Sequence, residues 1–293
     1  MNYLKVCNFN IMSHSHGHFF FGNDNICETK QQYLSRYLNT LSILETIITN
    51  YHPVDILSLE EVTPESYEVL YPMISKYYHL YISEIFSPSG LGTLLVTGFN
   101  KTIFPIKTVI QDLTEDFQQF YSMNNSKNYP CRSQIFQINL YNKEFIYSHL
   151  HAPGIPDDSI KNTYFSKVKE FILAIGENKF HIICGDFNED RLDFLKNIFE
   201  NRFKIIYDER PTSYHRFTKN NSGEYSENEI QYKKVDHLMI SSGLFIESYQ
   251  VVYNSTYGLG NHLSGVRGDG NVNPYYKLQD IWYPHMNSLG YIW

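Results

Sequence analysis

The sequence predicts an α/β protein whose core is two sheets of mixed or antiparallel strands, with helices packed outside. Strand-like apolar runs recur along the whole chain, and several consecutive runs are separated only by turns. Two longer stretches carry apolar residues at three-to-four spacing, which is typical of amphipathic helices. Because strands and helices do not alternate regularly, a two-sheet core is favoured over a single parallel sheet.

The predicted elements follow from these patterns. Gln32–Tyr51 is predicted to be a helix that ends before Pro53, and Thr163–Glu177 is predicted to be a second helix. Each helix leads directly into a strand that ends in acidic residues. The polar segment Asp112–Tyr129 is expected to be a long surface loop or an insertion. The predicted strands are Leu4–Ile11, Ile56–Leu59, Leu94–Phe99, Ile135–Leu140, Phe145–His149, His181–Cys184, Val235–Ile240 and Ser248–Tyr253.

The domain organisation is predicted from length and composition. The chain of 293 residues is 42% hydrophobic and 19% charged, so it can bury a large core. We find no internal repeat, low-complexity tract or Pro/Gly/Ser-rich linker that would mark a domain boundary. We therefore expect residues 1–293 to form a single domain with an aromatic C-terminal extension over about residues 270–293. The extension is expected to pack against the sandwich, and a less favoured interpretation is a platform on which bases stack.

The sequence favours an intracellular, cytoplasmic protein. No apolar stretch approaches the roughly 20 residues that cross a bilayer. The segment Met1–Ile11 has the pattern of a first strand and lacks the basic start and long apolar middle of a signal peptide. The four cysteines show no CxxC spacing, and Cys7 and Cys184 lie in strand-like runs. Buried free thiols in a reducing compartment are therefore expected.

The formal net charge of −7 argues against a broad basic surface for polyphosphates. A phosphate-bearing substrate would therefore require a divalent metal to offset the carboxylates of the site. The charge weakens a tight, non-specific DNA-binding role without excluding a nuclease.

Acids, amides and histidines gather at the ends of the predicted strands. Glu61 can hold a hard cation such as Mg²⁺, which prefers oxygen ligands, and Asp186 can take a proton from attacking water. Asp236 can pair with His262 and keep this histidine charged beside a phosphate. A metal, a base and positive charge at the phosphate are the parts that phosphoester hydrolysis needs. In chain order the clusters are Asn10, Glu60-Glu61, Ser148–Pro153, Gly185–Asn188, Val235–Ser241 and Gly260–His262.

This ordered set resembles the endonuclease/exonuclease/phosphatase superfamily, the DNase I-like metal-dependent phosphohydrolases. Pro53–Val62 is similar to the family pattern pDIl-l-QEv, with Glu60 where Gln is usual. Pro211–Tyr214 resembles the usual approach to the late aspartate, which follows here in Val235-Asp236. The resemblance runs from the first strand to His262. It implies a four-layer α/β sandwich, with two mixed, mainly antiparallel sheets face to face and outer helices, and Mg²⁺ or Mn²⁺ as the cofactor.

The resemblance also implies a role for each matching residue. Glu61 would be the principal metal ligand, with Asn10 beside the metal or the scissile phosphate. His149 would contact the phosphate or help the leaving group. Asp186 would orient or deprotonate the attacking water, and Asn188 would hold this water or the phosphate.

The late motif carries the remaining roles. Asp236 would pair with His262, whose imidazolium would stabilise the pentacovalent transition state. Asn261 stands where the family usually has Asp, so it can touch a metal through its amide oxygen but brings no charge. His151 and Tyr214 are assigned to substrate binding.

Simpler interpretations exist for the two acidic clusters. Asp186 and Asn188, two residues apart at a strand end, are expected to point to the same side, but they could also form only an Asx-turn. Of Glu60 and Glu61, one is expected to be a solvated strand end. Glu61 is preferred as the ligand because Val62 follows it, as in the family pattern.

The histidines also have structural alternatives. His149 and His151 alternate on a strand and are expected to face the same side, with His151 as the less favoured site residue. His237 is expected to point away from Asp236 and to be a core or supporting histidine. The three histidines within His14–His18 are interpreted as a loop cluster rather than a transition-metal site.

The predicted function is divalent-metal-dependent phosphodiester hydrolysis by in-line attack of water. A nuclease or a DNA/RNA-end-processing phosphodiesterase, including the 5′-tyrosyl-DNA type, is the first choice, with nucleic acid as partner. The tripeptide Ser148-His149-Leu150 also occurs in relatives that cleave sphingomyelin and inositol phosphates. Hydrolysis of these two substrates is therefore the enzymatic alternative. A catalytically inactive binding module is a further alternative, supported only by Asn261. The sequence leaves the oligomeric state open.

Overall fold

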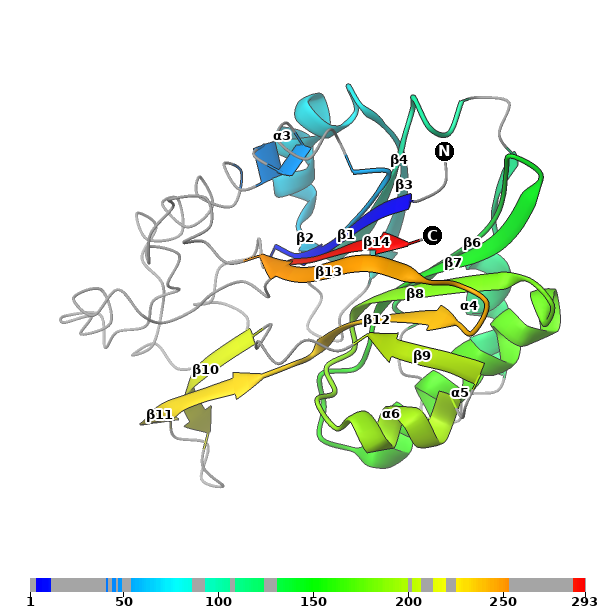
Figure 1. The fold of residues 1–293 in the computed structure, drawn as a ribbon. Helices are drawn as coiled ribbons and strands as arrows, with labels where there is room; N and C mark the ends of the chain where they lie inside the picture. The colour runs from blue at the N-terminus through cyan, green and yellow to red at the C-terminus, as the bar shows by residue number, and fades with distance from the viewer. Residues whose placement is uncertain are drawn as a thin grey trace.

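The computed structural model describes residues 4–11, 41, 44, 45, 47, 48, 54–85, 93–105, 109–123, 131–199, 202–206, 213–219, 225–252 and 287–292. Over these residues the chain forms two six-stranded sheets that pack face to face, with helices on the outer faces (Figure 1). This arrangement confirms the predicted α/β sandwich with two mixed, mainly antiparallel sheets.

The first sheet has the strand order β13-β14-β1-β2-β4-β3. Its central strands β1 and β2 are parallel, and every other neighbouring pair in this sheet is antiparallel. The strands are β1 (Leu4–Asn10), β2 (Ile56–Val62), β3 (Tyr78–Ile85), β4 (Thr93–Asn100), β13 (Ile246–Val252) and β14 (Asn287–Ile292).

The second sheet has the strand order β5-β6-β7-β8-β12-β9. It repeats the plan of the first, because its central pair β7 and β8 is parallel and its outer pairs are antiparallel. The strands are β5 (Val109–Asp112), β6 (Ser133–Leu140), β7 (Lys143–His151), β8 (Phe180–Asp186), β9 (Phe203–Ile206) and β12 (Asp236–Ser241).

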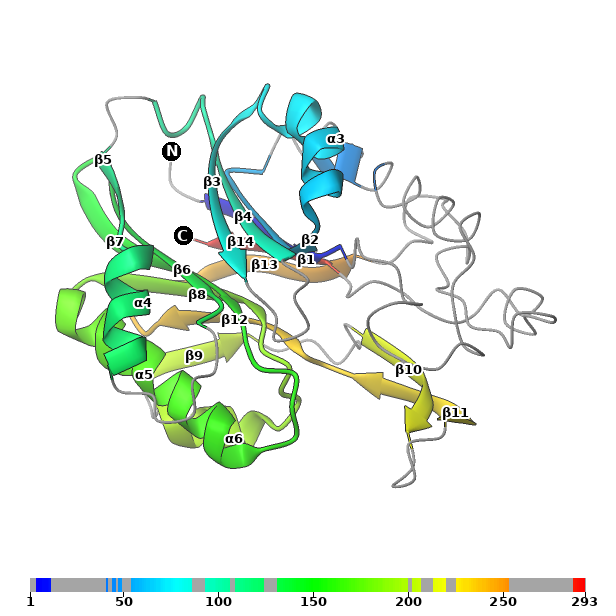
Figure 2. The same ribbon diagram turned by 180° about the vertical axis from the view of Figure 1, so that it is seen from behind.

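Helices cover the outer faces of both sheets, as Figures 1 and 2 show from opposite sides. Helix α3 (Pro64–Ile74) lies against the first sheet, together with helical residues between 41 and 48. Helices α4 (Thr114–Met123), α5 (Asp158–Gly176) and α6 (Leu192–Phe199) cover the second sheet. A hairpin of β10 (Ser213–Lys219) and β11 (Tyr225–Lys233) extends away from the sandwich (Figure 1).

Three apolar layers hold the four structural layers together. One fills the space between the two sheets and includes Phe99, Phe136 and Tyr147, whose rings meet edge to face. The other two lie between each sheet and its own helices, where Phe9 and Phe165 are fully buried examples. The strands of the central pairs are therefore largely buried on both faces, which explains the apolar runs in their sequences.

All eight predicted strands are present, with ends shifted by a few residues. The helix predicted over Thr163–Glu177 starts earlier, because the Asp157 side chain caps the backbone amides of Ser159 and Ile160. Of the helix predicted over Gln32–Tyr51, residues 41, 44, 45, 47 and 48 are described and are helical. The buried thiols of Cys7 and Cys184 are free, as expected.

One expectation about the fold is wrong. The segment Asp112–Tyr129 is not a plain loop, because α4 occupies its first half and buries Phe117 and Tyr121 against α5. Of the expected C-terminal extension, residues 287–292 are described, and they form β14 inside the first sheet between β1 and β13. No helix in the described part of the chain is both long enough and apolar enough to span a membrane.

Candidate metal and catalytic site

The candidate site lies at the carboxyl ends of the four central strands. Asn10 ends β1, Glu61 lies at the end of β2, His151 ends β7 and Asp186 ends β8. Within each parallel pair the carboxyl ends share one edge of the sheet. The two sheets bring these edges together, as the 3.1 Å hydrogen bond from Asn10 Nδ2 to Asp186 Oδ2 shows. Ligand sites of α/β proteins commonly form outside such strand ends.

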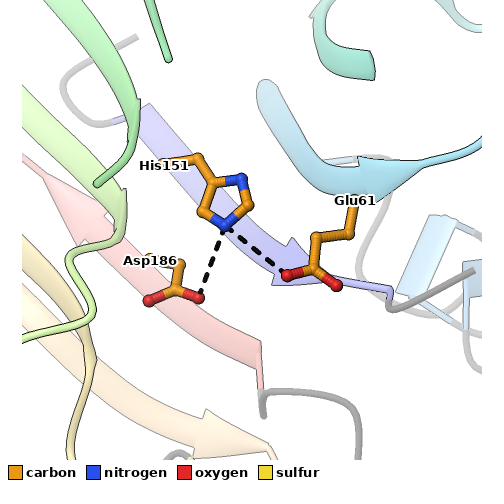
Figure 3. A group of neighbouring side chains, drawn as sticks. All are labelled: Glu61, His151 and Asp186. Carbon is orange, nitrogen blue, oxygen red and sulfur yellow. Dashed lines mark ion pairs between the residues drawn. The ribbon is translucent and has the colours of Figure 1, made fainter. Parts of the chain in front are cut away.

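Glu61, His151 and Asp186 form the centre of the site (Figure 3). The Nε2 atom of His151 lies 3.5 Å from Glu61 Oε1 and 4.0 Å from Asp186 Oδ2. One ligand atom from each of the three side chains lies within 4.8 Å of the other two. His151 and Asp186 are buried, and the Glu61 side chain keeps 13% of its surface exposed. The site is therefore largely enclosed by protein and open on the side of Glu61.

This donor set fits a divalent cation. Two carboxylate oxygens and one imidazole nitrogen are ordinary ligands for such ions. Two atoms that bind one ion at about 2.1 Å from neighbouring coordination positions lie about 3 to 3.5 Å apart. The 3.5 Å between His151 and Glu61 is already in this range, and the 4.0 Å to Asp186 needs only a small side-chain shift.

Glu60 and Glu61 point in different directions because the strand is irregular between them. Glu61 has a φ of 55°, and the pairing of β2 with β4 shifts register between Leu59 and Val62. Such irregularities next to active sites redirect side chains. The expectation that one of the two glutamates is a solvated strand end is wrong, because Glu60 is fully buried between the sheets and Glu61 faces the site.

His149 does not face the site. Its ring is fully buried, with Nε2 2.9 Å from Glu60 Oε1 and Nδ1 2.9 Å from Thr97 Oγ1. Gln134 fixes the tautomer: its Nε2 donates to the Tyr81 carbonyl, so its Oε1 faces Thr97 and the His149 Nδ1 atom, which must carry the hydrogen.

The Glu60–His149 pair is held in its neutral form. Burial, with a smaller contribution from the charge of His151, lowers the pKa of His149 to about 3. Burial also raises the pKa of Glu60 well above its usual value, and the carboxylates of Asp236 and Asp186 raise it further. We therefore assign the proton to Glu60, which donates it to His149 Nε2.

These contacts reverse the expectation for the two histidines of β7, in which His149 was favoured over His151 as the residue of the site. His149, expected at the phosphate, lies two residues deeper along β7 and is enclosed between the sheets. His151, the less favoured candidate, is level with Asp186 in the β7–β8 register and belongs to the centre of the site. His149 is thus paired with Glu60 inside the sandwich, whereas His151 is next to Glu61 and Asp186 at its edge.

The Gly185–Asn188 turn holds Asp186 in place. The backbone amide of Asn188 donates to Asp186 Oδ1 at 2.7 Å, so the alternative Asx-turn is present. The other oxygen, Oδ2, accepts from Asn10, and the turn thus orients the carboxylate toward the centre. Asn188 has a φ of 47° beyond the end of β8, so strand alternation does not set its direction. Its Nδ2 donates to the Ala152 carbonyl at 3.0 Å.

An ionic network supports this turn from behind. Lys161 of α5 donates to the Asn188 carbonyl and lies 3.3 Å from Glu189 Oε2. Arg191 binds both oxygens of Glu189 and, with two further bonds, Asp158. Burial alone would raise the pKa of Glu189, but the hydrogen bonds from Arg191 and Lys161 outweigh it and lower the pKa to about 2. Sequence reasoning missed this network, although Lys161 on the inner face of an amphipathic helix was an available signal.

Asp236 and His237 lie on opposite faces of β12, as expected. Asp236 is buried and is directly opposite Asp186 in the β8–β12 register. The His237 Nε2–H donates to the Glu189 carbonyl at 2.7 Å, and its ring contacts Phe187 edge to face. His237 is thus a supporting residue of the turn.

Several predicted residues lie outside what the structure describes. These are Asn261, His262 and the histidines of the 14–18 segment, so the pairing of Asp236 with His262 stays a prediction. Tyr214 lies on β10, with its side chain outside the described part.

Comparison with known proteins rests on structure alone, because no family model and no curated protein matches the sequence. An endonuclease/exonuclease/phosphatase family protein from Bacteroides thetaiotaomicron has a TM-score of 0.60 at 14% identity, covering 99% of this chain and 97% of that one. TDP2 from D. rerio, solved with a single-strand DNA product, has a TM-score of 0.61 at 12% identity, covering 100% and 99%. ANGEL2, a 2′,3′-cyclic phosphatase solved with adenosine-2′,3′-vanadate, has a TM-score of 0.65 at 12% identity, covering 99% and 95%. The chain therefore has the fold of the endonuclease/exonuclease/phosphatase proteins.

Proposed function

We propose that the protein is a divalent-metal-dependent phosphoester hydrolase, and specifically a phosphodiesterase that processes nucleic acid or its ends. The observation that carries the proposal is the convergence of Asn10, Glu61, His151 and Asp186 from four separate strands of two sheets. Side chains from so far apart in the sequence meet at one point, and that point has the ligand atoms and the enclosure that metal-assisted hydrolysis requires.

Each residue of the site would have its own role in hydrolysis. Glu61 and Asp186 would hold the cation, which when bound would polarise the phosphate and offset its charge. Asp186 would also orient the attacking water or accept its proton, because Asn10 and the Asn188 amide fix both of its oxygens. Asn10 would position Asp186 and contact the phosphate. Asp236, with the late His262, would supply the remaining stabilisation at the phosphorus.

Nucleic acid is the proposed substrate for two reasons. Two of the proteins with this fold were solved with a DNA product or an adenosine derivative. The site is a small, enclosed centre in a chain of net charge −7, which suits one phosphate at a strand end better than a long duplex. Sphingomyelin and inositol phosphates remain the competing substrates, and the test includes them.

The test offers purified protein bis-p-nitrophenyl phosphate, single- and double-stranded DNA, RNA, sphingomyelin and an inositol phosphate, with Mg²⁺, Mn²⁺ or EDTA. We expect metal-dependent cleavage of a nucleic acid that EDTA abolishes. Asp186→Asn is expected to lose at least about a thousandfold in kcat. Asp190→Asn, an exposed aspartate four residues further along, is the matched control and should retain the parent rate.

Three results would change the proposal. Cleavage of a lipid or an inositol phosphate alone would replace the nucleic-acid substrate. Equal rates for Asp186→Asn and the parent would show that this carboxylate does not take part. Metal binding without turnover of any substrate would favour an inactive binding module.

A further inference from the structure

We propose that His151 is a direct metal ligand, and that its imidazole makes the centre select late first-row ions such as Co²⁺ or Zn²⁺ over Mg²⁺. The inference deepens the proposed function, because it names the ion class of the same site. It concerns binding of the ion and can be tested without any substrate.

The first argument is the position of the imidazole nitrogen. His151 Nε2 is directed between the two carboxylates of the centre, as the dashed lines in Figure 3 show. Its distances to Glu61 Oε1 and Asp186 Oδ2 are 3.5 and 4.0 Å. Both separations are longer than the about 2.7–3.2 Å of a normal hydrogen bond between nitrogen and oxygen.

The second argument is a comparison within the same strand. His149, two residues earlier on β7, makes a close 2.9 Å contact with Glu60. His151 instead keeps its nitrogen further from two carboxylates at once. A shared proton would draw the nitrogen toward one oxygen, whereas a shared cation holds all three atoms about 3 to 3.5 Å apart. The 3.5 Å from His151 Nε2 to Glu61 Oε1 is that of a cation site, and the 4.0 Å to Asp186 Oδ2 reaches it after a small side-chain shift.

The third argument is preorganisation. The backbone amide of His151 donates to the Arg132 carbonyl at 2.8 Å, and the residue is opposite Asp186 in the β7–β8 register. Asn10 and the Asn188 amide hold the Asp186 carboxylate. Because the backbone on both sides is fixed and the side chains are buried, an ion entering the site meets ligands that are already gathered.

The ligand types then determine the selectivity. Mg²⁺ prefers all-oxygen, octahedral sites and keeps several of its waters, so a buried imidazole is a poor ligand for it. Imidazole suits Zn²⁺ and the other late first-row ions, whose affinities for nitrogen ligands exceed that of Mn²⁺. A site with one imidazole and two carboxylates therefore favours Co²⁺ and Zn²⁺ over Mg²⁺.

The experiment measures ion binding to metal-free protein by calorimetry with Co²⁺ and with Mg²⁺, and by the visible absorption of bound Co²⁺. We expect Co²⁺ to bind at least about a hundredfold more tightly than Mg²⁺, with an absorption that reports a nitrogen ligand. His151→Asn should weaken Co²⁺ binding about tenfold or more and leave Mg²⁺ binding within about threefold. His151→Asp, which makes the donor set all-oxygen, should strengthen Mg²⁺ binding and weaken Co²⁺ binding.

His79→Asn is the control for the loss of a histidine, because His79 lies on the outer strand β3 and pairs with β4. Thermal unfolding checks that each variant is folded. Unchanged Co²⁺ affinity in His151→Asn, or equal losses for Co²⁺ and Mg²⁺, would overturn the proposal while leaving a metal-dependent enzyme intact. Binding of neither ion to the parent protein would remove the proposed function as well.

Discussion

Gly185→Ala is expected to separate the two parallel strands that carry half of the candidate site. Gly185 has a φ of 144°, in a region that side chains rarely adopt, and it is opposite Leu150 in the β7–β8 register. An added Cβ would lie 1.8 Å from the Leu150 carbonyl oxygen, whereas ordinary contacts begin at 3.4 Å. Relief requires a displacement of about 1.6 Å, which is a third of the roughly 4.8 Å between neighbouring strands.

Such a displacement would break hydrogen bonds as well as strain the backbone. The bond from the Ala152 amide to the Asp186 carbonyl, now 2.7 Å, lies directly beside the substitution. Backbone strain contributes about 1–3 kcal/mol, and each lost ladder bond about 0.5–1.5 kcal/mol. We expect Gly185→Ala to lower the free energy of unfolding by roughly 3–5 kcal/mol, a loss reached only by severe substitutions.

The assay is urea unfolding followed by circular dichroism, with two other glycines as controls. A Cβ at Gly154 would meet Asn188 Oδ1 at 3.4 Å, an ordinary contact, so Gly154→Ala should lose less than about 1 kcal/mol. A Cβ at Gly98 would meet the Tyr78 side chain at 3.1 Å, so the loss in the free energy of unfolding for Gly98→Ala should lie between those for Gly154→Ala and Gly185→Ala. A Gly185→Ala protein as stable as Gly154→Ala would refute the steric argument.

Two further predictions concern pH. Burial raises the pKa of Glu60 in the folded protein above its usual value of 4.5, so the unfolded chain loses this proton at a lower pH than the folded protein does. The free energy of unfolding therefore falls as the pH rises above 4.5. The Glu60→Gln variant has no proton to lose at this position, so this loss of stability is removed. Metal-free Glu60→Gln should therefore unfold at a higher temperature than the parent near about pH 8 but not near about pH 4, and parallel pH profiles would contradict the neutral pair. Glu189 has the opposite effect, because its pKa in the folded protein is lowered from 4.5 to about 2. Its contribution to the free energy of unfolding is therefore present above pH 4.5 and is lost as the pH falls toward about 2. Glu189→Gln should cost roughly 1–3 kcal/mol at neutral pH in urea unfolding, and a difference that did not shrink in acid would exclude the network around Arg191 as its source.

The strands were predictable because their apolar runs are continuous, and the acidic strand ends were predictable because polar residues follow those runs directly. The choice of Glu61 over Glu60 came from the family resemblance, since strand alternation does not reveal the positive φ of Glu61 or the irregular pairing of β2 with β4 that turn it toward the site. Helix α4 had a usable signal. Its buried residues Thr114, Phe117 and Tyr121 follow a helical spacing within a polar segment.

The two histidines of β7 show a different limit. Alternation places both on the same face, but only the register with β8 reveals that His151 is level with Asp186 and that His149 is deeper. Register is a property of two segments, and a pattern within one strand does not contain it. The strand β14 was not predicted for the same reason, because its partners β1 and β13 are distant in the sequence.

The buried position of His149 follows from what holds the two sheets together. Three side-chain hydrogen bonds cross between the sheets, and they join Glu60 with His149, Thr97 with Gln134 and Ser58 with Tyr147, at 2.9, 2.7 and 2.6 Å. The Glu60–His149 bond lies one residue from Glu61 and two from His151, on the strands that supply one ligand atom from each sheet. Apolar packing alone would tolerate small slips between the sheets, whereas a buried hydrogen bond with fixed partners does not. We therefore expect His149 to act on the site through alignment, by keeping the ligand from the first sheet opposite the ligands from the second.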